Sequence, residues 1–437
     1  MPATCCKSCA SNDAAGANVR AAPRLSSGAA TMKIVYHHRI ASKDGQAVHI
    51  DGLVGALRHA GHQVVVVGPP VAERTEFGAE SGLVAFIRRR LPRAFAEWLE
   101  LAYNVPAFFR IWRAVKRHAP DAIYERYNLF LLAGAALRAM TGIPLLLEVN
   151  APLFAERCRY GGLTMKGVAR GAEKFVWRRA DVVLPVTEVL AQSVGAAGVD
   201  PARIVVIPNG VSEDFLTSDK PSRAVRSELG IDGRLVLGFV GFVRDWHGLD
   251  AAIDVVAERG DDLDLHLLVI GDGPALEALR RHAARRGAAD RVTFTGIVPR
   301  SAIRRYVAAF DVALQPSVVP YASPLKIFEY MALGLPIVAP DAPNVREILR
   351  DGETALLTEP DHPQELAAAI ERLAGDVELR KRLAGNARQT LLDRSFTWRA
   401  NAERVVALAA ALAEKRCCSR RAPGDPQSSI PRTGEPI

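Results

Sequence analysis

The feature that most constrains the fold of this chain is an alternation of short apolar runs, rich in β-branched residues, with stretches of helical periodicity. Runs that are apolar throughout are typical of strands buried on both faces, and their alternation with helices indicates a parallel sheet covered on both sides. The strands predicted in the first half of the chain are Lys33–Tyr36, Gln63–Val67, Ala122–Tyr124, Pro144–Val149 and Val182–Val186. The sequence therefore predicts the α/β class.

The same alternation restarts after residue 208, which predicts a second doubly wound domain of similar size. Its strands are expected at Leu235–Val240, Leu265–Ile270, Arg291–Thr295, Val312–Gln315 and Pro336–Ala339. Between the two series, Val206–Gly210 contains Pro, Asn and Gly and is the best candidate for a linker. Two facing sheets of this kind form a cleft at the carboxyl ends of their strands, where ligands of doubly wound sheets bind.

Helical periodicity and composition complete the predicted domain organisation. Helices are expected, among others, at Val48–Ala60, Ala275–Arg286, Leu325–Leu333 and Trp398–Ala413. The predicted divisions are a disordered tail at 1–31, an N-terminal domain at 32–207, a C-terminal domain at 208–395, a helix at 396–415 that packs back toward the N-terminal domain, and a disordered tail at 416–437.

Composition excludes several classes of protein. No apolar run reaches the roughly 20 residues that span a bilayer, and residues 1–31 lack the apolar region of a signal peptide. We therefore expect a cytoplasmic protein. Because Met32 opens the stretch that contains the first predicted strand, our hypothesis is that translation starts there. The net charge of +8 is modest and no nucleic-acid-binding motif is present, so we expect no nucleic-acid partner. Five of the six cysteines lie in the two tails at spacings that fit no usual zinc site, and we interpret them as reduced thiols.

The most informative stretch is Tyr321–Pro336, which follows a predicted strand. Ser323 suits the N-cap of the next helix and Pro324 suits its first position, so the free N–H groups of the helix form an anion site in the cleft. Lys326 in the first turn opposes the helix dipole unless an anion binds there. Glu329 lies one turn further on the same face, where its carboxylate can accept hydrogen bonds from two ribose hydroxyls. From the spacing alone, a surface Lys–Glu pair is an equally good interpretation.

The stretch Ser-Pro-Leu-Lys-Ile-Phe-Glu-Tyr-Met-Ala-Leu-Gly-Leu-Pro resembles the nucleotide-binding signature of retaining family 4 glycosyltransferases. These enzymes have the GT-B fold, in which two Rossmann-like, doubly wound parallel-sheet domains face each other across a cleft. Glu329 matches the second of the two glutamates of the signature, which in the family binds the ribose hydroxyls. The first glutamate falls on Tyr321, and this departure leaves the identity of the transferred sugar open.

The resemblance covers nearly all of Lys33–Ala413 and implies a function. It implies a retaining hexosyltransferase that uses an NDP-sugar, either a UDP-sugar or a GDP-sugar, as co-substrate. The implied acceptor is a saccharide or a lipid-linked molecule, and the implied role is synthesis of cell-surface polysaccharide or glycolipid. No cofactor and no metal ion are expected, because the resemblance implies a donor clamp of cationic side chains without acidic metal ligands.

The family resemblance also predicts a phosphate-binding loop at Gly238–Leu249, with Gly241 as its second glycine. Phe242 occupies the position of an arginine found in many relatives, and His247 occupies the position of a lysine. We therefore predict that Arg244 and Lys326 clamp the diphosphate and stabilise the charge of the leaving group, with His247 as a weaker contact or a surface residue. Arg244, Lys326 and Glu329 are the predicted catalytic residues.

Two further matches extend the predicted donor site. Val269–Pro274 resembles a strand–loop–helix element of the family, in which Gly271 lets the backbone approach a ligand. Thr293–Pro299 resembles the loop whose backbone holds the base, with Ile297 nearest; simple core packing of Ile297 is the alternative. The other predicted donor-binding residues are Gly45, Tyr321, Ser323, Pro324 and Leu325.

The acceptor side is predicted from two strand ends. Relatives have a glycine turn after the first strand, which Gly45 fits, and Asp44 is its candidate acceptor contact. His49 follows as a helix residue that either packs or lines the cleft. Glu148 and Asn150 end another strand in the cleft and are candidates to contact the sugar, although Glu148 equally suits a salt bridge or a backbone amide. No acid–base pair is assigned.

Residues 83–118 combine basic and aromatic side chains at helical spacing. This pattern is typical of peripheral contact with an anionic membrane, at the inner face for a cytoplasmic protein. Amphipathic helices that pack on the sheet and leave their arginines in water are the alternative.

Two other functions also remain open: a nucleotide-sugar 2-epimerase, and a non-catalytic sugar-nucleotide-binding subunit, which the departures at Tyr321, Phe242 and His247 suggest.

Overall fold

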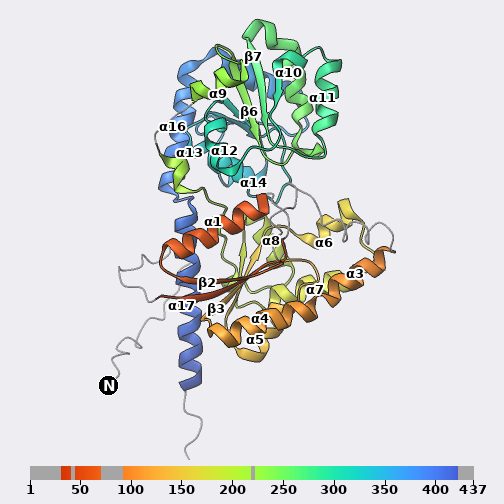
Figure 1. Ribbon diagram of the computed structural model, residues 1–437, viewed down its shortest axis with the longest axis vertical. Coiled ribbons are helices and arrows are strands. Elements are labelled where there is room, and N and C mark those ends of the chain that lie inside the picture. The colour runs from red at the N-terminus through yellow and green to blue at the C-terminus, as the bar shows by residue number, and fades with distance from the viewer. Residues whose placement is uncertain (1–30, 41–44, 70–91, 218–221, 422–437) are drawn as a thin grey trace, which may run out of the picture. The chain divides into compact units, whose positions relative to one another are not determined.

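The computed structural model describes residues 31–40, 45–69, 92–217 and 222–421. In this part of the chain the strands form two sheets, and every strand pair in them is parallel (Figure 1). The structure therefore confirms the α/β class and the two doubly wound units. We refer to the elements from β1 to α8 as the first lobe and to those from η3 to α16 as the second lobe.

The first lobe contains a sheet with the order β2-β1-β3-β4-β5. Its strands are β1 Lys33–His37, β2 Gln63–Val67, β3 Ala122–Arg126, β4 Leu145–Val149 and β5 Val182–Pro185. Its helices are α1 Gly45–His59, α3 Arg93–Ala102, α4 Asn104–His118, α5 Ala133–Thr141, α6 Leu153–Glu156, the π-helix η1 Arg157–Gly161, α7 Lys166–Arg179 and α8 Glu188–Ala196, followed by the 3₁₀ turn η2 Pro201–Arg203.

The second lobe contains a sheet with the order β11-β10-β9-β6-β7-β8. Its strands are β6 Leu235–Val240, β7 Leu265–Ile270, β8 Val292–Phe294, β9 Val312–Leu314, β10 Ile337–Pro340 and β11 Leu356–Thr358. Its helices are α9 Ser222–Leu229, α10 Leu249–Leu263, α11 Leu276–Arg285, α12 Arg300–Val307, α13 Leu325–Ala332, α14 Pro343–Arg346, α15 Pro363–Gly375 and α16 Val377–Asp393, and its 3₁₀ turns are η3 Glu213–Leu216, η4 Asp245–His247 and η5 Ala289–Arg291.

Each predicted strand is present, with ends that differ by at most two residues from the prediction. The short strand β11 was not predicted, because three residues are too few to show a period. Helix α17 (Trp398–Arg421) continues six residues past the predicted end at 415, so the prediction of disorder for 416–421 is wrong. No glycine or proline interrupts the sequence before Pro423, so nothing stops the helix earlier. The predicted tail at 1–31 lies almost wholly outside the described residues.

Both sheets are covered on two faces by apolar helices. In the first lobe, α4, α5, α7 and α8 pack on one face, whereas α1 and α17 pack on the other (Figure 1). Helix α17 reaches α1 closely because Gly52 has no side chain: a Cβ there would lie 2.5 Å from Nε1 of Trp398. In the second lobe, α9, α12 and α13 cover one face, and α10, α11 and α15 cover the other.

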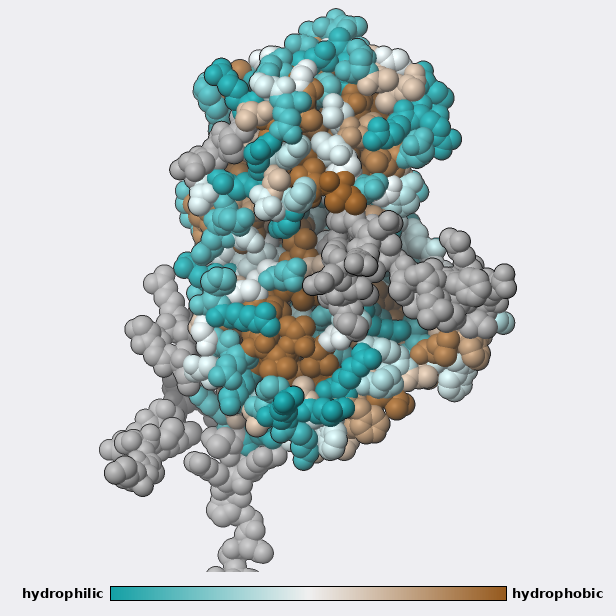
Figure 2. Space-filling view, in the orientation of Figure 1, coloured by the Kyte–Doolittle hydropathy of each residue, from teal (hydrophilic) through white to brown (hydrophobic). Residues whose placement is uncertain are grey.

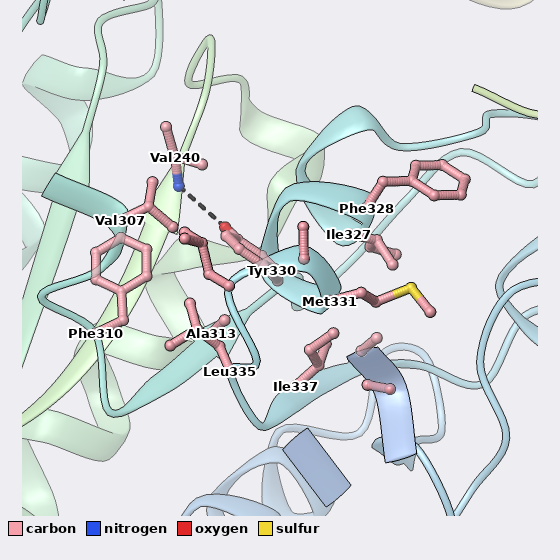
Figure 3. Packing of buried hydrophobic residues seen from close by; sticks show 14 of the residues in the cluster. Val240, Val307, Phe310, Ala313, Ile327, Phe328, Tyr330, Met331, Leu335 and Ile337 are labelled. Carbon is pink, nitrogen blue, oxygen red and sulfur yellow. Dashed lines mark hydrogen bonds between the residues drawn. The ribbon is translucent and has the colours of Figure 1, made fainter. Parts of the chain in front are cut away.

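Helix α13 is held tightly against the second sheet. Its residues Ile327, Phe328, Tyr330 and Met331 are fully buried and pack among side chains from the sheet and from α12 (Figure 3). The hydroxyl of Tyr330 accepts a hydrogen bond from the N–H of Val240, at 3.2 Å. This contact ties the second turn of α13 to Val240, the last residue of β6. Among the described residues, no helix is long and apolar enough to cross a bilayer.

Candidate functional site

The order of strands in the second sheet reverses between β6 and β9, and the loops that follow these two strands leave in opposite directions. In doubly wound sheets such a crevice at the carboxyl ends of the strands is the usual ligand site. The loop after β6 contains Gly241, Arg244 and His247, and the loop after β9 leads to Lys326. The structure brings Arg244, His247 and Lys326 together. Nζ of Lys326 lies 3.8 Å from the ring centre of Phe239, the ring centre of His247 lies 5.0 Å from the same point, and the backbone N–H of Arg244 donates to His247.

Lys326 lies in the first turn of α13, with Nζ 3.8 Å from the centre of the Phe239 ring. Gly241 makes room for it: a Cβ there would lie 3.3 Å from Nζ, and its φ of +140° also favours glycine. Burial lowers the pKa of Lys326 to about 7, against the opposing charge of Glu329. Its ammonium group is therefore poorly solvated, and an anion beside it would stabilise the charged form.

The imidazole of His247 accepts a hydrogen bond at Nδ1 from the backbone N–H of Arg244, at 3.1 Å. Burial, followed by the charges of Lys326 and Arg244, lowers the pKa of His247 to about 2, so the ring is neutral. A neutral ring that accepts at Nδ1 carries its proton on Nε2. His247 is thus a hydrogen-bond donor at this site, and it does not replace the positive charge of the lysine found in relatives.

Arg244 is held by two aromatic rings, with Cζ 4.7 Å from the centre of Phe242 and 4.8 Å from the centre of Trp246. Phe242, which stands where relatives have an arginine, therefore supports an arginine two positions later. Stacking of this kind fixes the plane of a guanidinium while leaving its N–H groups free to bind an anion.

Glu329 is 6% exposed and lies on the buried side of α13. Nη1 of Arg300, the first residue of α12, donates a hydrogen bond to Oε1 of Glu329 at 2.9 Å. Burial raises the pKa of Glu329, whereas Arg300 and, less strongly, Lys326 lower it. The interpretation as a surface Lys–Glu pair is therefore wrong, since the carboxylate is buried and its partner is Arg300. Arg300 follows the predicted base-binding loop directly, and this adjacency was the only signal for it in the sequence.

The predicted N-cap at Ser323 is wrong. Helix α13 begins at Leu325, and Pro324 occupies the N-cap position without a side-chain cap. The Oγ of Ser323 instead accepts a hydrogen bond from the N–H of Asn209 at 3.1 Å, because the linker segment passes beside it. The N–H groups of the first turn of α13 therefore have no side-chain cap and are available to a ligand.

The structure places three other predicted donor-binding residues in three different environments. Ile297 is 54% exposed, so its interpretation as a core residue is wrong. Tyr321 is partly buried, and burial and a hydrogen bond with Glu156 of the first lobe raise its pKa. Gly271 has a φ of +126°, and a Cβ there would lie 2.1 Å from the carbonyl oxygen of Gly241. The absence of a side chain at Gly271 therefore lets the neighbouring loop approach, and its predicted approach to a ligand stays a prediction.

The acceptor candidates form a closed polar cluster. Glu148 is 2% exposed and accepts hydrogen bonds from Nε2 of His49 at 2.9 Å and from the hydroxyl of Tyr124 at 2.7 Å. It also pairs with Arg126 and with the amide of Asn150. Burial alone would raise the pKa of Glu148, but the charges of His49 and Arg126 hold it well below its usual value. The salt-bridge interpretation of Glu148 is therefore confirmed.

His49 lies between two acceptors. Its Nδ1 is 2.7 Å from Oδ1 of Asn209, and the amide orientation of Asn209 is fixed because its Nδ2 donates to the carbonyl of Ser323 at 2.6 Å. Since Nε2 faces the carboxylate of Glu148, both ring nitrogens of His49 have hydrogen-bond partners inside the cluster. His49 thus packs within the cluster.

Gly45 begins α1, where a Cβ would lie 3.8 Å from Cδ1 of Leu325, and Asp44 lies outside the described residues.

A cavity of about 680 Å³ opens at the corresponding point of the first sheet, where β1 and β3 are neighbours. Its lining includes Arg39, Gln46, Asn128, Asn150, Glu156 and Arg157. Asn150 is therefore the predicted acceptor residue that reaches this cavity. In the described part of the chain, no group of three or more His, Cys, Asp or Glu side chains could hold a metal ion.

The helices of the predicted membrane segment are amphipathic, and residues 83–91 lie outside the described part of it. Ala107, Ile111 and Val115 of α4 pack on the first sheet, as the alternative interpretation required. The outer faces of α3 and α4 nevertheless carry large apolar side chains, as Figure 2 shows over α3. These are Phe95, Trp98, Leu99, Val105, Phe109 and Trp112, with exposures from 36% to 61%.

Two family models match the chain, one in each lobe. Residues 43–215 match the model described as Glycosyltransferase Family 4, and residues 234–376 match the model described as Glycosyl transferases group 1. The D-inositol 3-phosphate glycosyltransferase of Acidothermus cellulolyticus is 32% identical over 317 residues, which are 68% of this chain and 68% of that protein. The chain belongs to glycosyltransferase family 4. The predicted family is therefore confirmed.

Two other proteins are similar to this family 4 glycosyltransferase. The alpha-D-kanosaminyltransferase of Streptomyces kanamyceticus is 29% identical over 255 residues, 56% of this chain and 65% of that protein. The crystal structure of Anabaena Alr3699/HepE in complex with UDP-glucose superimposes with a TM-score of 0.68 and 21% identity, over 87% of this chain and 99% of that chain. The second similarity and the two parallel sheets confirm the GT-B fold.

Proposed function

We propose that this protein transfers a hexosyl unit from a nucleoside diphosphate sugar to an acceptor hydroxyl, with retention of the anomeric configuration and without a metal ion. The observation that carries the proposal is the group of Arg244, His247 and Lys326 beside the uncapped start of α13. These groups supply positive charge and N–H donors, and among the residues that the structure describes no carboxylate forms an ion pair with Arg244 or Lys326, which suits a diphosphate. Glu329 lies one turn further along and suits the ribose.

The proposed reaction depends on stabilisation of the leaving group. The bond between the anomeric carbon and the phosphate oxygen breaks, the acceptor oxygen forms the new bond, and the acceptor proton passes to the leaving diphosphate. Charge that develops on the diphosphate is met by Lys326, by Arg244 and by the N–H groups of α13, which are already in place. Preorganised groups of this kind lower the barrier without a general base on the protein.

The proposed donor is a UDP- or GDP-sugar, and the similar Anabaena protein in complex with UDP-glucose supports a search that starts with UDP-sugars. The proposed acceptor is a saccharide or a lipid-linked molecule that enters the cavity of the first lobe, and the proposed role is synthesis of surface polysaccharide or glycolipid. Its polar lining, with Asn128 and Asn150, suits a molecule rich in hydroxyls.

We further propose that the enzyme acts at the inner face of the membrane in the cytoplasm, through the outer faces of α3 and α4. Exposed Arg110, Arg113, Lys116 and Arg117 lie on the same helix as Phe109 and Trp112. Basic and aromatic side chains on one surface suit the headgroup region of an anionic bilayer.

A panel of UDP-, GDP- and ADP-sugars tests the proposal. We expect one donor to raise the melting temperature and to be hydrolysed slowly to free nucleotide, equally well with and without EDTA. Proton NMR of the transferred sugar reports the anomeric configuration. Binding without hydrolysis or transfer supports a non-catalytic subunit instead, release of a 2-epimeric sugar supports an epimerase, and loss of turnover in EDTA contradicts metal independence.

A further inference from the structure

We propose that Arg300 is a positioning residue of the nucleotide site, which anchors one oxygen of Glu329 and keeps this carboxylate ionised so that it can accept both ribose hydroxyls. This inference rests on the proposed function, because it assumes that Glu329 binds a ribose. Arg300 lies outside the nucleotide-binding signature at Ser323–Pro336.

The contact has a geometry suited to this role. Nη1 of Arg300 donates to Oε1 of Glu329 at 2.9 Å, and within the described residues Oε2 of Glu329 has no hydrogen-bond partner. The guanidinium lies over the ring of Phe215, with Cζ 5.6 Å from its centre. Phe215 belongs to η3 and is itself 2% exposed, so the arginine is supported from a third element.

The charges around Glu329 explain why Arg300 is needed. The charged groups that face it are Arg300 from α12, Lys326 from its own helix and Asp214 from η3. Burial and Asp214 favour the protonated carboxyl, whereas the two cations favour the carboxylate. Lys326 forms no ion pair with Glu329 in the described structure, and its Nζ lies over Phe239. Arg300 is therefore the cation in direct contact.

Ionisation matters for the chemistry of recognition. An ionised carboxylate has only acceptor sites, so it can take hydrogen bonds from the 2′- and 3′-hydroxyls of a ribose together. A protonated carboxyl adds a donor and loses this match. As the pH falls through the pKa of Glu329, nucleotide affinity must fall, and without Arg300 this fall must begin at a higher pH.

If Arg300 only stabilised the fold, its removal would affect the melting temperature and not the pH dependence of nucleotide binding. The side chain of Arg300 is 47% exposed, and half-exposed ion pairs contribute little to folding stability. Its other charged neighbour is Asp51 of α1, whose pKa is raised by burial and lowered in part by Arg300. A structural role would change the melting temperature and would leave the pH dependence of nucleotide binding unchanged.

The test is titration calorimetry of the full chain with UDP and with GDP between pH 5.5 and 8.5. For Arg300→Met we expect the loss of affinity relative to wild type to be several-fold larger at pH 6 than at pH 8, because the Glu329 carboxyl of the variant is protonated to a greater extent at the lower pH. Protonation of the nucleotide phosphate is common to both proteins and cancels in the ratio. Arg300→Lys should restore most of the affinity at pH 6.

The matched control is Arg305→Met, which removes an arginine from the same helix that pairs with Glu228 at the surface. It should follow wild type at every pH. If Arg300→Met is poorly folded, Arg300→Lys and wild type are compared with UDP and 2′-deoxy-UDP, and the lysine must retain the preference for UDP. A ratio that stays constant with pH in a folded Arg300→Met overturns this inference alone, whereas failure of wild type to bind UDP or GDP overturns the nucleotide site as a whole.

Discussion

The carboxyl ends of the two sheets present opposite kinds of polar chemistry. In the first lobe, Glu148 and His49 lie in a buried cluster in which each charge already has its partner. In the second lobe, Lys326 and Arg244 lie on aromatic rings, and no carboxylate is in ion-pair contact with them in the described structure. The comparison teaches that folding itself supplies partners for Glu148 and His49, whereas we propose that an anionic ligand supplies the partner of Lys326 and Arg244.

The largest effect is expected from removing the cation of α13. Lys326→Ala should lower kcat/KM for the nucleotide-sugar by about 10²- to 10³-fold, as the loss of one preorganised charge donor does in other enzymes. Steady-state kinetics with the donor found by the panel measure this loss. Lys381→Ala, which removes an exposed lysine paired with Glu378, is the control. Equal activity of both variants would contradict the proposal that Lys326 binds the diphosphate of the donor.

The buried cluster should respond in stability, not in donor binding. Glu148→Gln removes the carboxylate that pairs with Arg126 and His49, and we expect a loss of about 3 kcal/mol in the free energy of unfolding. Urea unfolding measures it, and nucleotide affinity should change less than about threefold. Glu228→Gln at the surface is the control. A large loss of nucleotide affinity with normal stability would break the comparison.

A comparison of wild type with Glu148→Gln should also show how the free energy of unfolding depends on pH. The folded-state pKa of Glu148 is depressed, so its contribution is present above the unfolded value of about 4.3 and is lost as the pH falls through the lower folded value. The difference in unfolding free energy between wild type and Glu148→Gln should therefore be constant above about pH 5 and shrink in more acidic solution. A difference that grows in more acidic solution would show that the carboxylate is not stabilised by its neighbours.

A smaller effect on catalysis is expected at Arg244, which lies against the rings of Phe242 and Trp246. Arg244→Met should raise KM for the donor by about tenfold, because one charge-assisted contact with the diphosphate is lost. The double variant Phe242→Arg/Arg244→Phe places the cation where relatives have it and should recover part of the loss. Recovery would sharpen the comparison, since it would show that the charge matters more than its position in the loop. An unchanged KM in Arg244→Met would remove Arg244 from the donor site.

The smallest effect on chemistry is expected at the surface of the first lobe. Trp98→Ser and Phe109→Ser should abolish sedimentation with vesicles of anionic lipid at low salt, with donor hydrolysis unchanged within about twofold. Phe175→Ser removes an aromatic side chain of α7 that is 44% exposed, and it is the matched control. Sedimentation that persists in the first two variants, or that wild type lacks, would contradict a membrane role for α3 and α4.

The sequence alone predicted both sheets, because continuous apolar strands and helical periods are local patterns. It also placed Lys326 and Glu329 on one helix. It could not predict that Arg300 pairs with Glu329, or that Asn209 joins His49 to Ser323, because these contacts connect residues that lie 29, 160 and 114 positions apart. Ser323 was misassigned for the same reason, since its partner comes from the linker and not from its own helix.

What the sequence determined by itself is the alternation of strands and helices and the chemical types of residue in each loop, which depend on neighbours along the chain. The tertiary structure decided which of these residues have partners and which are left to bind a ligand in the proposed site. Burial and distant partners turned Glu148 and His49 into a satisfied cluster, while the same folding left Lys326 poorly solvated over Phe239. The charge state and availability of a side chain depend on what surrounds it in space, and this is settled only when the two sheets have packed.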